Sequence, residues 1–193
     1  PHAWKAGPQT QLLKEKIDAV ESGQQVVMVM PPNPYRCPPG PYERASMMAH
    51  LFKAKGVDAK IIIIDPKEKF SKEGLFLEGW EKYFPGMIEW YGPGVHGGIE
   101  GVDVEAGTVK TGIDTFHGDL MNIIPAQKAG VIAASAELTD DTGFCPIDAT
   151  SMRSKADENI FVIGDASIAG AMPKSAFSAN SQAKVASMNI RGD

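Results

Sequence analysis

Two short runs of consecutive apolar residues stand out in the first third of the chain. Residues 24–30 (QQVVMVM) and 60–65 (KIIIID) lack polar alternation, which is the pattern of strands buried on both faces of a parallel sheet. Residues 9–22 and 42–55 carry apolar side chains at helical spacing, and each run stops at a glycine. This order predicts a helix followed by a β-loop-α-β unit.

Weaker patterns follow along the rest of the chain. Seven glycines interrupt short alternating pieces, which predicts a small antiparallel β-meander inserted into the α/β unit. The remaining predicted elements are a helix at 71–84, the meander over 87–115, a strand at 116–124, a helix at 128–136, a buried strand at 159–165 and a helix from about 175.

These elements together predict an α/β protein with a Rossmann-like nucleotide-binding-type domain and a small antiparallel β insert. We expect residues 1–22 to form a linking helix. Residues 23–136 should form the nucleotide-type domain, with its meander at about 87–124. Residues 137–193 should form a separate segment.

Composition narrows the function classes. The 193 residues are 43% hydrophobic and 22% charged with a net charge of −5, as in an ordinary globular protein. No block of basic residues is present, which disfavours nucleic-acid binding. No apolar run approaches the roughly 18–20 residues of a transmembrane span. The four histidines show no metal-ligand spacing, so we expect no metal site.

Asp65 ends the second apolar run, where dinucleotide-binding units place an acidic residue on a ribose hydroxyl. The first turn contradicts that use. A proline-rich stretch, residues 31–41, replaces the G-x-G-x-x-G motif, and prolines lack the N–H donors that hold phosphate. We predict nucleotide-binding architecture without a nicotinamide nucleotide, and Asp65 has two open roles, as a ribose ligand or as a strand-end cap.

Cys37 and Cys145 both precede proline, which favours an extended backbone at each cysteine. The stiff proline-rich loop around Cys37 would hold its thiol in place, which suits chemistry. Two alternatives stay open: two unrelated structural cysteines, or one pair buried in a loop.

Residues 159–165 (NIFVIGD) lead into a segment rich in small residues and then a helix. A strand, a Gly-Asp pair and a helix N-terminus form an arrangement that suits a flavin: Gly164 permits close approach, Asp165 accepts from a ribityl hydroxyl, and the helix dipole favours an anionic ring. The alternative is an ordinary strand-turn-helix in which the aspartate caps the helix. The candidate cofactor-binding residues are Gly164, Asp165, Lys174, Ser175 and Ala176, with Lys174 adding a positive charge.

Several motifs resemble one family over nearly the whole chain. They are YRCPPGPYERA at 35–45, GFCPID at 143–148, FVIGDASIAGAMPKSAFSANSQAKVA at 161–186, HAWKAG at 2–7, FSKEGLFLEGWEKYF at 70–84, MIEWYGPG at 87–94 and MNIIP at 121–125. The sequence is similar to the flavoprotein subunit of flavocytochrome c sulfide dehydrogenase, within the FAD/NAD(P)-binding disulfide-reductase-like class.

The resemblance implies a function. It implies FAD as cofactor, hydrosulfide as substrate and a redox-active disulfide between Cys37 and Cys145. Hydrosulfide would open this disulfide, and electrons would pass through the flavin to a c-type cytochrome subunit. It also implies the bacterial periplasm. Glu43 could manage protons, although it could equally be a first-turn residue that stabilises the helix dipole.

The resemblance also has departures. The family's N-terminal flavin-binding unit, with its G-x-G-x-x-G motif, is not in this sequence, and neither is the C-terminal portion. We therefore expect a fragment in which 137–193 is the returning segment of the FAD-binding domain, with weak or no FAD binding and no activity alone. The alternatives are a fragment of a sulfide:quinone or NADH-type flavoprotein reductase, or a non-enzymatic α/β interaction domain.

Overall fold

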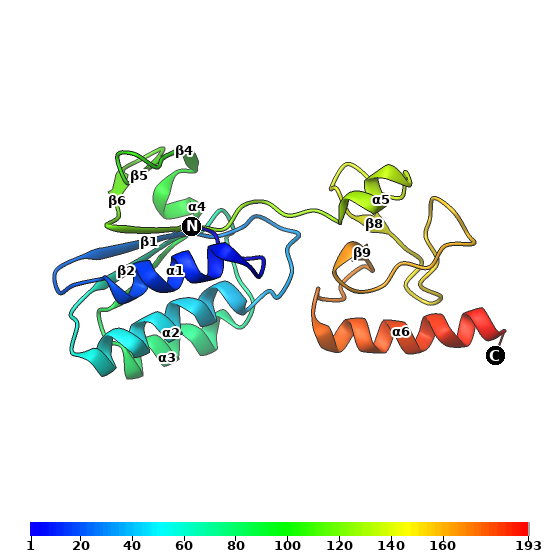
Figure 1. Ribbon diagram of the computed structural model, residues 1–193, viewed down its shortest axis with the longest axis horizontal. Coiled ribbons are helices and arrows are strands. Elements are labelled where there is room, and N and C mark those ends of the chain that lie inside the picture. Colours follow the sequence, from blue (N-terminus) through cyan, green and yellow to red (C-terminus); the bar gives the residue numbers. More distant parts are fainter. Residues whose placement is uncertain (193) are drawn as a thin grey trace. The chain divides into compact units, whose positions relative to one another are not determined.

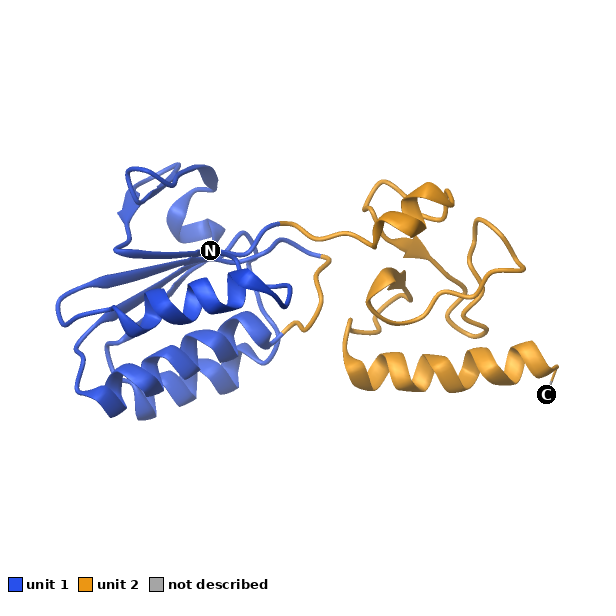
Figure 2. Ribbon diagram, in the orientation of Figure 1, with its two compact units in different colours: residues 1–33, 39–125 blue, residues 34–38, 126–193 orange. Residues whose placement is uncertain are grey.

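The computed structural model describes residues 1–192, which fall into two compact units (Figure 2). Unit 1 comprises residues 1–33 and 39–125. Unit 2 comprises residues 34–38 and 126–193. The division falls after residue 125, whereas the sequence placed it after residue 136. The short segment 34–38, which the sequence assigned to the nucleotide-type domain, belongs to unit 2.

A parallel sheet of four strands forms the centre of unit 1. Its order is β3 (Ile88–Tyr91), β2 (Lys60–Ile64), β1 (Gln25–Val29) and β7 (Leu120–Ile123). Both neighbours of β1 pair with it in parallel register. The two apolar runs are therefore the two central strands, as predicted, and burial on both faces explains their lack of polar alternation.

Three helices cover one face of this sheet: α1 (Pro8–Asp18), α2 (Gly40–Lys55) and α3 (Glu73–Tyr83), as Figure 1 shows. Val26 and Met28 of β1 pack in the core with these helices. The intervening Val27 and Val29 belong to a second cluster on the opposite side of the strand.

The second cluster lies under a small antiparallel sheet. Its strands are β4 (Ile99–Asp103), β5 (Thr108–Thr111) and β6 (Thr115–His117), in that order. Val109 of β5 is fully buried against the parallel sheet. The short helix α4 (Pro93–His96) precedes this sheet. The predicted antiparallel insert is therefore present.

Two details of the predicted meander are wrong. Residues 88–91 form β3, a parallel strand of the main sheet. The strand predicted at 116–124 is divided between β6 and β7, which belong to different sheets. The break lies at Gly118 and Asp119, whose N–H groups donate to Gly107 and Gln25 and so redirect the chain.

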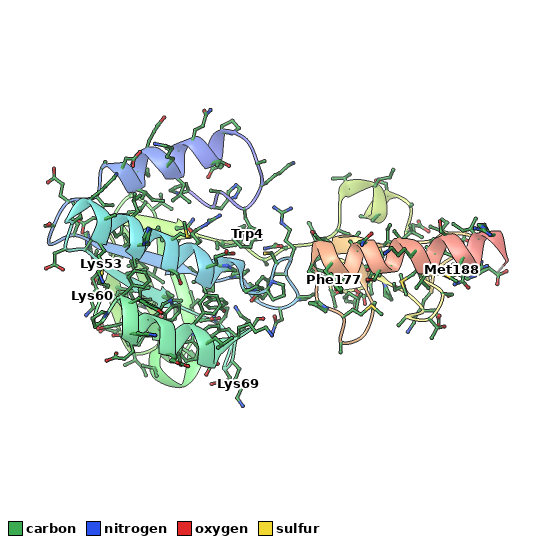
Figure 3. The ribbon with its side chains drawn as sticks, turned by 90° about the horizontal axis from the view of Figure 1, so that it is seen from below. Trp4, Lys53, Lys60, Lys69, Phe177 and Met188 are labelled. Carbon is green, nitrogen blue, oxygen red and sulfur yellow. The ribbon has the colours of Figure 1, made fainter. Side chains whose placement is uncertain are left out.

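The predicted linking helix is part of unit 1. Leu13 of α1 and Val20 beyond it are buried in the helix-side core. The segment before α1 is also held: Arg44 donates to the carbonyl oxygen of His2 at 2.8 Å, and its guanidinium lies 4.9 Å from the centre of the Trp4 ring (Figure 3). Asn122 of β7, fully buried, donates to the same His2 carbonyl.

Unit 2 has less regular structure. It contains α5 (Val131–Ser135), the paired strands β8 (Cys145–Pro146) and β9 (Ser167–Ile168), a 3-10 turn η1 (Gly164–Ala166) and the long helix α6 (Ala176–Arg191). The helices predicted at 128–136 and from about 175 are α5 and α6. No helix within residues 1–192 is long and apolar enough to cross a membrane.

The buried strand predicted at 159–165 is not formed. Phe161 makes one isolated bridge with Arg153, and the N–H of Val162 donates to the carbonyl of Met152. Ile163 is 41% exposed, and Gly164 begins η1. The apolar run therefore pairs with an irregular loop, and the loop bonds replace the ladder that a strand needs.

Candidate functional site

The Cys37 loop is tied to unit 2 by its main chain. The N–H of Cys37 donates to the carbonyl of Lys174 at 2.7 Å, and the N–H of Arg36 donates to the Gln127 side chain at 3.1 Å. The buried Tyr35 donates its hydroxyl to the Pro38 carbonyl, which closes the loop on itself. These bonds place Cys37 in the same unit as Cys145, although 107 positions lie between them in the sequence.

Cys37 is exposed, and the extended backbone predicted for it is wrong: its φ is 53°, in the left-handed region that non-glycine residues rarely adopt. Such backbone persists only where neighbouring contacts enforce it, and it is enriched at functional sites. The hydrogen bond from the Cys37 N–H to the Lys174 carbonyl is such a contact.

Cys145 is fully buried in β8, opposite Ser167 of β9. Burial raises the pKa of its thiol, because the thiolate is poorly solvated there. The positive charge of Lys174 acts in the opposite direction and lowers this pKa, and the negative charge of Asp140 raises it. Burial is the largest of these effects, so the pKa of Cys145 lies above its ordinary value and the protonated thiol is favoured, although Lys174 offsets part of the shift.

The expected disulfide is not formed in this structure. Both cysteines are free, Cys37 with an exposed side chain and Cys145 with a buried one. Both cysteines interact with Lys174 in unit 2. The Cys37 N–H donates to the Lys174 carbonyl, and the Lys174 charge lowers the pKa of Cys145. The structure thus presents a pair of thiols where the sequence predicted a bridge, and the bridge stays a prediction.

Glu43 belongs to unit 1, whereas both cysteines belong to unit 2. It is exposed in the first turn of α2, where a carboxylate stabilises the partial positive charge of a helix N-terminus. The sequence left two roles open for Glu43, proton transfer and stabilisation of the helix dipole, and its position in the first turn of α2 matches the second.

The start of α6 assembles most of the predicted flavin residues. Gly164 has φ 70°, which favours glycine, and its N–H donates to the buried Gln182 side chain at 2.7 Å. Ser175 caps α6 by accepting from the N–H of Ser178. Ala176 is exposed at the first position of the helix.

These residues fit the polar groups of a flavin. Asp165 is exposed, and its carboxylate makes no hydrogen bond or ion pair within residues 1–192, so it can accept from a ligand hydroxyl. The N-terminus of α6 leaves backbone donors for an electron-rich edge. Ile163, Met172 and Phe177 add exposed apolar surface in the same segment, and Phe177 is labelled on α6 in Figure 3.

Lys174 differs from its predicted role. Its ammonium is directed inward: only 8% of the residue is exposed, and Nζ donates to the carbonyls of Asp165 at 2.9 Å and Ser167 at 2.5 Å. Nζ also lies 3.8 Å from the centre of the Phe144 ring. The charge is therefore directed to the Ser167 carbonyl and the Phe144 ring, contacts that the sequence pattern did not reveal.

The nucleotide-type unit carries a closed polar cluster at Asp65. Its carboxylate is fully buried and accepts from the Tyr42 hydroxyl at 2.5 Å and from the Trp90 indole at 3.0 Å. The other oxygen accepts from the N–H of Lys67 at 3.0 Å and pairs with its ammonium at 2.7 Å. Protein donors thus occupy this carboxylate, and of its two open roles the structure supports the strand-end cap.

Comparison with known proteins identifies the class and then the family. The fold is that of the FAD/NAD(P)-binding disulfide oxidoreductases. A family model described as "Sulfide dehydrogenase [flavocytochrome c] flavoprotein chain, central" matches residues 10–125. The chain belongs to this family, which is one of flavoprotein oxidoreductases.

Solved structures share the fold at low sequence identity. A NAD-dependent persulfide reductase from A. fulgidus matches with a TM-score of 0.63 and 15% identity, over 100% of this chain and 35% of its own. An FAD-dependent pyridine nucleotide-disulphide oxidoreductase from Desulfovibrio vulgaris matches at 0.53 and 20%, over 94% and 46%. A chain of the Tetrahymena thermophila mitochondrial ATP synthase structure matches at 0.64 and 18%, over 100% and 49%. The chain thus spans about half or less of the length of these proteins.

Proposed function

We propose that this chain supplies the sulfur chemistry of a flavin-dependent sulfide-oxidising enzyme. The proposal rests on the residues that unit 2 contains. One unit holds both cysteines. The Cys37 N–H donates to the Lys174 carbonyl, and the Lys174 ammonium donates to the carbonyl of Ser167, which pairs with Cys145 across β8 and β9. The same unit presents an exposed Asp165 and the N-terminus of α6.

In the proposed reaction, Cys37 and Cys145 form a disulfide in the oxidised enzyme. Hydrosulfide attacks one sulfur of the bridge. The new S–S bond gives a persulfide that keeps the substrate proton, while the old S–S bond breaks and its electron pair leaves on the other cysteine as a thiolate. The exposed thiol position of Cys37 makes it the accessible point of attack.

FAD, when bound, supplies the acceptor for the two electrons released in the oxidation of sulfide. Asp165 would accept from a ribityl hydroxyl, Gly164 would allow close approach, and Ser175 and Ala176 would direct the N-terminus of α6 at the flavin. We assign the next electron acceptor to a c-type cytochrome and the location to the periplasm, on the family to which the chain belongs. Since the chain covers part of its relatives, we expect the complete subunit to be needed for activity.

Serine replacement of each cysteine in the complete subunit tests this proposal. We expect Cys37→Ser and Cys145→Ser each to abolish sulfide-dependent reduction of the flavin and to leave the circular dichroism spectrum unchanged, because neither variant can form the bridge. Met47→Ser, which removes another exposed sulfur from unit 1, serves as the control and should keep the parent rate. Parent-like turnover in either cysteine variant would refute the assignment.

A further inference from the structure

The side chain of Lys174 is held in the interior of unit 2. Only 8% of the residue is exposed, and its Nζ donates to the carbonyl of Asp165 at 2.9 Å and to the carbonyl of Ser167 at 2.5 Å. The ammonium also lies 3.8 Å from the centre of the Phe144 ring. Because removing an ammonium from water is costly unless its donors are bound, these bonds keep the buried side chain in one place.

The main chain of the same residue holds the Cys37 loop. The Lys174 carbonyl accepts from the Cys37 N–H at 2.7 Å. This bond acts on a residue with φ 53°, a conformation that a non-glycine residue keeps only where its surroundings enforce it. The neighbouring N–H of Arg36 donates to the Gln127 side chain, so two consecutive N–H groups of the loop are bound within unit 2.

The side chain of Lys174 also anchors the turn that carries Asp165. This turn, η1, presents the exposed carboxylate that we assign to a ribityl hydroxyl of FAD, and two buried side chains bond to its main chain. Gln182 accepts from the N–H of Gly164 at 2.7 Å, and Lys174 donates to the Asp165 carbonyl at 2.9 Å. Within residues 1–192, Lys174 is the anchor of the two that also bonds to the main chain of Cys37.

We propose that Lys174 is a positioning residue that fixes Cys37 relative to the flavin-binding turn. It bonds to the cysteine through its carbonyl and to the Asp165 segment through its ammonium, so both segments have a common support. Reaction between two bound groups needs a fixed geometry, and a misplacement of about 1 Å can cost about 100-fold in rate. The inference rests on the proposed function, because Cys37 needs this geometry only if its sulfur reacts beside a flavin.

Amide hydrogen exchange of the reduced chain measures this tether directly, without flavin or sulfide. Labelling with 15N-cysteine gives two amide signals, and Cys145→Ser assigns them. We expect the parent Cys37 amide to exchange more slowly than in a free peptide, because its N–H is bound. We expect Lys174→Met to speed this exchange about tenfold, and Lys174→Arg to restore most of the protection.

Gln182→Met is the matched control. It replaces the other buried anchor of η1 with a side chain of similar size, and Gln182 bonds to Gly164 and Met172, not to the Cys37 loop. We therefore expect parent-like exchange at Cys37 in this variant. A general loss of stability would also speed exchange of the buried Cys145 amide, so the ratio of the two rates separates a local tether from a global effect.

The rate of flavin reduction in the complete subunit gives a second readout. We expect Lys174→Met to lower the limiting rate with sulfide about tenfold and to leave the half-saturating sulfide concentration unchanged, because the tether orients the cysteine and binds no substrate. Unchanged Cys37 exchange or an unchanged limiting rate in Lys174→Met would overturn the inference. If Lys174→Met does not fold, the parent decides: a Cys37 amide that exchanges as fast as in a free peptide would contradict the tether.

Failure of this inference and failure of the proposed function are distinguishable, because the exchange readout needs no disulfide. Faster Cys37 exchange in Lys174→Met together with parent-like turnover in Cys37→Ser would reject the proposed function and leave the tether in place. Unchanged exchange together with inactive cysteine variants would reject the tether alone.

Discussion

The carboxylate of Asp65 is already bound by other residues of the protein, so it is not available to bind a nucleotide ribose. Asp65 stands at the carboxyl end of β2, where dinucleotide-binding units hold a ribose, and its carboxylate is surrounded by the Tyr42, Trp90 and Lys67 donors. The carboxylate serves the stability of unit 1 in this arrangement. The sequence revealed an acidic residue at a strand end. It could not reveal Tyr42 and Trp90 as partners, because they come from separate segments, whereas Lys67 lies only two positions away.

We predict that Asp65→Ala strongly destabilises unit 1. The substitution leaves the Lys67 ammonium buried without its counter-ion, which costs about 3–5 kcal/mol in comparable pairs. Urea denaturation followed by tryptophan fluorescence measures the free energy of unfolding. Adding Lys67→Met should recover part of the loss, because the uncompensated charge is then removed. A loss below about 1 kcal/mol in Asp65→Ala would place this pair among weak surface pairs and contradict the burial argument.

Lys174 is the residue for which the sequence interpretation failed most. A lysine before a helix N-terminus suggested a charge presented to a ligand, yet its ammonium is directed to the Asp165 and Ser167 carbonyls. Side-chain direction at this position depends on the packing of β9 and Phe144. Such packing is not encoded in local spacing.

Elements with strong apolar patterns were predicted well. The runs at 24–30 and 60–65 became β1 and β2, and the helical runs became α1 and α2, with ends that moved by a few residues. The buried side chains are consecutive in the two strands, which are covered on both faces, and recur at helical spacing in α2, so the pattern and the packing agree.

Elements whose pairing depends on distant neighbours were predicted less well. The apolar run at 159–165 lacks a strand partner in unit 2 and forms a bridge and a turn. The run at 116–124 looked like one strand, but Gly118 and Asp119 bond to Gly107 and Gln25 and divide it between two sheets. Periodicity alone carries no information on such long-range bonds.

The turn after β8 allows a prediction on pH. One oxygen of the Asp148 carboxylate accepts from the hydroxyl and N–H groups of Thr150 and Ser151. These bonds lower its pKa from 3.8 to about 2. The folded state therefore prefers the ionised form, so this contribution to stability is present above pH 3.8 and is lost as the pH falls through about 2.

We expect Asp148→Asn to flatten the pH dependence of the urea midpoint of unit 2 between pH 4 and pH 2. Thr150→Val with Ser151→Ala should flatten it in part, because the hydroxyl donors are removed and the N–H donors remain. A parent-like slope in Asp148→Asn would show that other carboxylates control stability in this range.

The molecule consists of two units. In the nucleotide-type unit, protein donors bind the carboxylate of Asp65 at the end of β2, and the other unit holds both cysteines. The family resemblance predicted this class correctly from the motifs, and the match over residues 10–125 confirms it. The sequence could not predict that residues 34–38 belong with 126–193. This loop lies between two segments of unit 1 in the chain but packs with unit 2.

Counting free thiols tests the central claim most directly, because the proposed reaction needs Cys37 and Cys145 to form one reducible bond. The chain is exposed to air, denatured, and treated with a thiol reagent before and after reduction, with mass spectrometry to identify the linked peptides. The account predicts no reactive thiol before reduction, a single linked peptide pair containing Cys37 and Cys145, and both thiols after reduction. Two reactive thiols in the air-exposed chain without reductant would contradict it.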